Sequence, residues 1–134
     1  MTITYPVPNI DIHYRKAGVW HHEPLNKYFN PSTRSLLVLL QGAWISNASA
    51  LCYDRVSLGY SDVILCLQHD SFVLNAWAAD IDLQRVRLLP DGNGDLIRYL
   101  GCETKDHAGV ARAHPTEWEV CSQAIKYRGE VRWK

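Results

Sequence analysis

Residues 83–102, LQRVRLLPDGNGDLIRYLGC, give the clearest indication of the fold. The first part alternates, so that Val86 and Leu88 face away from the neighbouring arginines, as in a half-buried strand. The DGNGD segment that follows favours a turn, because Gly and Asn accept positive φ angles. A second apolar run comes after the turn. The pattern predicts a β-hairpin around residues 84–102.

Further strands are indicated on both sides of this segment. Residues 61–67, SDVILCL, form a short apolar run that is typical of a buried strand. Residues 117–124 and 129–133 are predicted to be strands near the end of the chain. The 134 residues suffice for one hydrophobic core. We therefore predict a single compact α+β domain spanning residues 1–134, with a strand-rich second half.

The composition excludes several classes of protein. Hydrophobic residues make up 47% and charged residues 21% of the chain, which predicts an ordered globular protein. Fourteen basic residues balance fourteen acidic ones, so nucleic acid is not indicated as a partner by the net charge. The N-terminal residues lack the pattern of a secretory signal, and the longest apolar stretch is too short to cross a bilayer. We expect a cytoplasmic protein with no membrane association.

The four cysteines are spaced too widely for a metal knuckle. They are Cys52, Cys66, Cys102 and Cys121, and none forms a Cys-x-x-Cys pair. We therefore expect no metal. In a cytoplasmic protein, such thiols are predicted to be reduced and to belong to the core.

Residues 117–120, EWEV, provide the strongest candidate for chemistry. A strand here places Glu117 and Glu119 on one face and Trp118 and Val120 on the other. Two carboxylates on one face are candidates for acid/base chemistry or for stabilising an oxocarbenium ion. The alternative interpretation is the solvated face of an ordinary strand.

Residues 115–120, PTEWEV, together with the later Tyr127 and Val131, resemble the closing strand of the ADP-ribosyltransferase superfamily. The resemblance implies an enzyme that transfers ADP-ribose from NAD to a macromolecular acceptor. A fixed carboxylate favours this reaction because positive charge develops on the ribose in the transition state. By the pattern of one branch of the family, Glu119 is catalytic and Glu117 orients the acceptor. By that of another branch, Glu117 is catalytic.

Two earlier segments extend the resemblance to a binding site for NAD. Residues 45–47, Ile-Ser-Asn, stand where the family has a strand ending in Ser-Thr-Ser, so Ser46 is expected to line the nicotinamide pocket. His13 and Arg15 share one face of a predicted strand, and either is a candidate for holding the cofactor. The alternative interpretation of His13 and Arg15 is an exposed strand edge.

A non-enzymatic function accounts for the sequence equally well. Small, neutral chains with several tryptophans often act by covering the surface of a partner, and five tryptophans are present here. The alternative prediction is therefore a protein-binding inhibitor or immunity protein of a bacterial or phage conflict system. The two hypotheses differ in one testable respect, because the enzyme requires residues 13–15, 46 and 117–119 to converge on one site.

Overall fold

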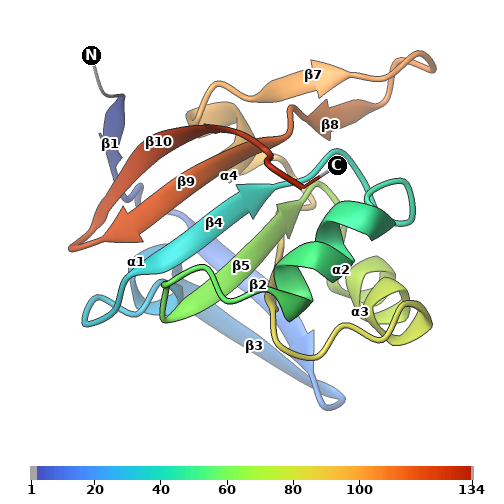
Figure 1. The fold of residues 1–134 in the computed structure, drawn as a ribbon, viewed down its shortest axis with the longest axis horizontal. Helices are drawn as coiled ribbons and strands as arrows, with labels where there is room; N and C mark the ends of the chain where they lie inside the picture. Colours follow the sequence, from blue (N-terminus) through green and yellow to red (C-terminus); the bar gives the residue numbers. More distant parts are fainter. Residues whose placement is uncertain (1–2, 134) are drawn as a thin grey trace.

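The structure, a computed structural model, describes residues 3–133 and is built around one six-stranded sheet (Figure 1). The order of strands across the sheet is β1-β10-β9-β4-β5-β6. Strands β4, β5 and β6 run parallel, while β9 is antiparallel to both β4 and β10, and β10 is antiparallel to β1. Their bounds are Thr4–Pro6 for β1, Ser35–Leu39 for β4, Asp62–Leu67 for β5, Arg87–Pro90 for β6, Thr116–Cys121 for β9 and Ala124–Glu130 for β10.

Two small antiparallel pairs and four helices complete the fold. The pairs are β2 (Asp11–Lys16) with β3 (Val19–Pro24), and β7 (Glu103–Lys105) with β8 (Ala111–Ala113). The helices are α1 (Leu25–Tyr28), α2 (Asn47–Arg55), α3 (Ser71–Asp80) and α4 (Asp95–Tyr99). Each parallel connection passes through α2 or α3, as expected for crossovers between parallel strands.

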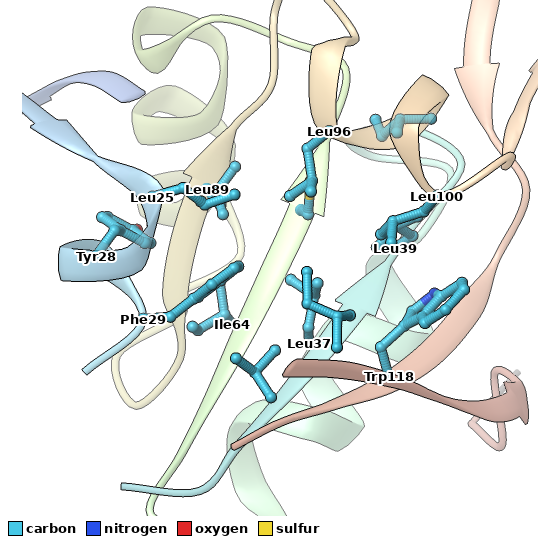
Figure 2. Packing of buried hydrophobic residues seen from close by; sticks show 14 of the residues in the cluster. Leu25, Tyr28, Phe29, Leu37, Leu39, Ile64, Leu89, Leu96, Leu100 and Trp118 are labelled. Carbon is cyan, nitrogen blue, oxygen red and sulfur yellow. The ribbon is translucent and has the colours of Figure 1, made fainter. Parts of the chain in front are cut away.

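The sheet has a hydrophobic core on each face. On one face, residues of α1 and α4 and Ile12 of β2 pack against Leu37, Leu39 and Trp118, as Figure 2 shows for most of them. On the other face, Tyr53 of α2 and Trp77 of α3 pack against the opposite side of β4 and β5. All five residues of β4 are buried because the strand is covered on both sides.

The predicted α+β class and single domain are confirmed, but the predicted hairpin around residues 84–102 is wrong. β6 pairs in parallel with β5, and the second apolar run forms helix α4. The buried carboxylate of Asp91 accepts hydrogen bonds from the backbone N–H groups of Leu96 and Ile97 and so fixes the start of this helix. The apolar residues that face the core follow helical spacing, with Leu96 and Leu100 four residues apart.

Within residues 3–133, none of the helices is both long and apolar enough to span a membrane.

Candidate functional site

A cavity of about 380 Å³ lies at the carboxyl end of β4, where the chain crosses into α2. Ligand sites in sheets with parallel strands commonly form at this end of the strands. The residues that line it include Gln41, Ser46, Ala48 and Ser49 from the loop and helix, and His114 and Glu130 from the opposite wall.

Hydrogen bonds fix the loop that leads into α2. The Gly42 N–H donates to Ser46 Oγ at 3.4 Å, and the Ala43 N–H donates to His69 Nε2 at 3.2 Å. Trp44 has a φ of 60°, which is uncommon for a bulky residue, and its indole N–H donates to Asp80 Oδ2 at 2.7 Å. The loop is therefore held to the turn after β5, through His69, and to α3, through Asp80.

The cavity is polar on two sides. His114 Nε2 lies 3.1 Å from the carboxylate of Glu130, and both side chains are exposed. On the helix side, the first turn of α2 presents Ala48 and Ser49, and the Ser49 hydroxyl donates to the backbone carbonyl of Trp133. The N-terminus of α2 contributes a positive partial charge to this part of the cavity.

Within residues 3–133, the cavity is lined by no cysteine, and all four cysteines are free. Cys66 on β5 and Cys102 after α4 are buried, and burial raises the pKa of both thiols. Because the thiolate is the nucleophilic form, neither of these is suited to attack a substrate. Cys52 is half-buried in the second turn of α2, and Cys121 is exposed at the end of β9.

Glu117 is buried and fully engaged by neighbouring groups. Its carboxylate accepts hydrogen bonds from the Tyr53 hydroxyl, from the Arg132 backbone N–H at 3.1 Å and from the Arg132 guanidinium at 2.9 Å. Burial, followed by the hydrogen bond to Glu117, raises the pKa of Tyr53. The carboxylate links β9, α2 and the C-terminal segment.

Glu119 lies on the same face of β9 as Glu117, while Trp118 and Val120 lie in the core on the other face. The predicted orientation of this strand is therefore confirmed. The Arg34 guanidinium donates to Glu119 at 2.8 Å, and this hydrogen bond lowers the pKa of the carboxyl. Arg128 lies 3.8 Å away on the next strand.

His13 and Arg15, the candidates for holding NAD, lie on β2, away from the two glutamates of β9. His13 on β2 stacks on His22 of β3 with 4.2 Å between the ring centroids, and Arg15 lies above Trp20 and Phe72. Strand β2 contacts α3 and the edge strand β6, and two strands separate β6 from β9. At the usual spacing between neighbouring strands, β6 and β9 are therefore about 14 Å apart.

Ser46 lies at the entrance to α2 and lines the cavity described above. The structure therefore does not bring residues 13–15, 46 and 117–119 into one site. Among the described residues, no cluster of three or more His, Cys, Asp or Glu side chains is placed to hold a metal ion.

No known family model matches the chain. It is nevertheless similar to curated proteins that are named peroxiredoxins. It is 32% identical over 99 residues to peroxiredoxin y4vD of Sinorhizobium fredii, a match that covers 67% of this chain and 52% of that protein. It is 42% identical over 90 residues to peroxiredoxin sll1621 of Synechocystis, covering 61% of this chain and 47% of that protein. The chain thus spans about half the length of these relatives.

Solved peroxiredoxin structures share the fold. Reduced Prx3 of Vibrio vulnificus in complex with H₂O₂ superimposes with a TM-score of 0.78 at 17% identity, covering 97% of this chain and 89% of the other. The 1-Cys peroxiredoxin of Plasmodium falciparum gives 0.79 at 17% identity, covering 93% and 81%. The chain therefore has the thioredoxin-like fold of the peroxiredoxins.

These findings correct the functional hypotheses drawn from the sequence. The similarity to peroxiredoxins contradicts the hypothesis of an ADP-ribosyltransferase and the alternative hypothesis of an inhibitor or immunity protein. It also contradicts NAD as the cofactor. The Glu-x-Glu pair belongs to an ordinary strand whose carboxylates are occupied by arginines.

Sequence reasoning missed the cavity at the start of α2. One signal was available: the segment after the buried strand of residues 35–39 contains Gly42 and then a helix start. If β4 and β5 had been recognised as parallel, the rule that ligand sites lie at the carboxyl ends of such strands would have pointed to this loop.

Proposed function

We propose that this protein reduces peroxides with a cysteine thiol, as a peroxiredoxin-type enzyme. The observation that carries the proposal is the sequence similarity of two thirds of the chain to curated peroxiredoxins. The shared fold supports it. We place the reaction in the cytoplasm, a reducing compartment in which cysteines remain thiols.

Cys52 is the thiol that we assign to the reaction. Burial disfavours the thiolate of Cys66 and of Cys102. Cys121 is exposed but lies on β9, outside the crossover between the parallel strands. Cys52 is partly exposed on α2, the helix that follows the first parallel strand, one turn beyond the residues that line the cavity.

The reaction proceeds in two balanced steps. The Cys52 thiolate attacks one peroxide oxygen, the O–O bond breaks, and a sulfenic acid and one molecule of water or alcohol form after uptake of a proton. Two thiol groups of an external reductant then return the sulfenic acid to the thiol, releasing water and the disulfide of the reductant. The implied partner is a dithiol, either a small molecule or a protein.

The test is consumption of hydrogen peroxide by the purified protein with dithiothreitol as the reductant. We compare the wild type with Cys52→Ser and with Cys121→Ser as the matched control. The proposal requires turnover that Cys52→Ser abolishes and Cys121→Ser preserves, together with trapping of a sulfenic acid by dimedone at Cys52. A wild-type rate equal to that of Cys52→Ser would overturn it.

A further inference from the structure

A second cavity, of about 430 Å³, lies between β2, α3 and the edge strand β6. Its volume falls in the range of sites for small organic ligands. Four of the residues that line it are cationic, namely Arg15, Lys16, Arg85 and Arg87, and the lining includes neither Asp nor Glu. Such a concentration of one charge in a concave site attracts anions.

Three of the four cations are available to a ligand. Arg87 is engaged by Asp62 at 2.9 Å and donates to the carbonyl of Tyr28 at 2.6 Å. Among residues 3–133, Arg15, Lys16 and Arg85 form no ion pair.

Two carboxylates near this cavity, those of Glu23 and Asp54, already accept hydrogen bonds from other groups. Glu23 accepts a hydrogen bond from the Tyr14 hydroxyl at 3.3 Å. Asp54 accepts the backbone N–H groups of residues 84–86, with the shortest contact 2.6 Å to Arg85. Both carboxylates keep their negative charge, but neither lines the cavity, and among residues 3–133 neither forms an ion pair with Arg15, Lys16 or Arg85.

The walls of the cavity are fixed in place. The Arg15 N–H donates to Ser71 Oγ at 3.0 Å, and the Asn75 amide donates to the Arg15 carbonyl at 3.0 Å, so that β2 is joined to α3. The guanidinium of Arg15 lies over Trp20 and Phe72, 5.7 and 5.5 Å from the ring centroids. The site is thus preorganised, which reduces the entropy cost of binding.

We propose that this cavity binds a phosphate-bearing organic molecule, a function beyond peroxide reduction. A phosphate monoester carries a charge of about −1.5 to −2 at neutral pH, which matches several cations better than a single carboxylate does. Guanidinium groups bind phosphate oxygens in a bidentate manner. Leu74, Val86 and Leu88 supply an apolar wall for the organic part.

The experiment is a calorimetric titration of the full chain with phenyl phosphate, and with inorganic phosphate for comparison. The variant Lys16→Gln/Arg85→Gln removes two cations of the cavity. The matched control, Lys105→Gln/Arg55→Gln, removes one lysine and one arginine that do not line it. All four side chains are exposed, so these changes leave the core intact.

The proposal predicts that phenyl phosphate binds more tightly than inorganic phosphate. It also predicts that Lys16→Gln/Arg85→Gln weakens the binding of phenyl phosphate at least about tenfold, because each charge-assisted hydrogen bond contributes strongly to affinity. The control variant should bind as the wild type does. Absence of binding, an equal loss in both variants, or equal affinity for the two phosphates would overturn it. Backbone amide NMR shifts near Lys16 and Asn75 would locate the ligand.

Discussion

Glu117 is a buried carboxylate that holds three separate parts of the chain together. It accepts hydrogen bonds from Tyr53 on α2 and from both the backbone and the guanidinium of Arg132. A buried charge is costly unless its oxygens are satisfied, and here they are. The residue therefore serves to dock α2 and the C-terminal segment on β9.

His69 gives the loop before α2 a dependence on pH. Its Nε2 accepts the Ala43 N–H, which requires the neutral ring. Burial, and then the nearby Arg112, lowers the pKa of His69 below its ordinary value of 6.5, whereas Asp70 opposes the shift. The unfolded chain therefore takes up this proton first as the pH falls. His69 stabilises the fold above about pH 6.5, and this stabilisation is lost as the pH falls through the folded pKa.

We predict that the urea midpoint of unfolding falls when the pH is lowered from about 7.5 to about 5. His69→Gln, which keeps an acceptor but cannot be protonated, should show a smaller fall over the same interval. Circular dichroism during urea titration measures both. An identical pH dependence in the two proteins would show that other groups cause the change.

At the scale of elements, the start of α2 is the part of the fold best suited to activate a thiol. The N–H groups of the first helical turn lower the pKa of a thiol placed there. Ala48 occupies this turn, is exposed and lines the cavity, whereas Cys52 lies in the next turn. Ala48 is therefore the position in this turn at which the effect can be tested.

We predict that Ala48→Cys in a Cys52→Ser background is alkylated by iodoacetamide about tenfold faster at neutral pH than Arg55→Cys in the same background, because a drop of one unit in pKa raises the thiolate fraction by this factor. Arg55 is the matched control because it is exposed in the last turn of the same helix. Mass spectrometry measures the rates. Equal rates would mean that the N-terminus of α2 does not activate a thiol.

Two segments were assigned incorrectly from the sequence: residues 129–133, where β10 already ends at Glu130, and α4. Before α4, only the second half of the alternating segment forms strand β6, Arg87–Pro90, and the turn over residues 91–94 is present. The segment after the turn was too short for its period to be recognised, since Leu96, Ile97 and Leu100 are compatible with either a strand or a helix. Two contacts decided the outcome. The cap by Asp91 is local, whereas the pairing of β6 with β5 depends on tertiary packing.

At the scale of the whole molecule, the central strand β4 contributes side chains to both hydrophobic cores. Leu37 and Leu39 face one core, and Leu36, Val38 and Leu40 face the other. β4 pairs with β5 on one side and with β9 on the other, so a change in its packing affects the neighbouring strands on both sides.

Leu37→Ala is therefore expected to lower the free energy of unfolding by about 2–5 kcal/mol, through lost burial and the cavity left in a region that is packed on all sides (Figure 2). Val19→Ala, at a side chain with 58% exposure on β3, should change it by less than about 0.5 kcal/mol. Equilibrium unfolding in urea measures both. A cost for Leu37→Ala no greater than for Val19→Ala would contradict this account.

The sequence by itself determined the α+β class, the buried strand of residues 62–67 and the two faces of β9, because each rests on the local alternation or clustering of apolar residues. Tertiary structure alone decided the parallel pairing of β4, β5 and β6 and the roles of Glu117 and Arg15. These depend on partners 15 to 64 residues away, such as Arg132 and Tyr53 for Glu117. Such contacts form only when the chain folds, since no local pattern specifies which distant group will satisfy a buried charge.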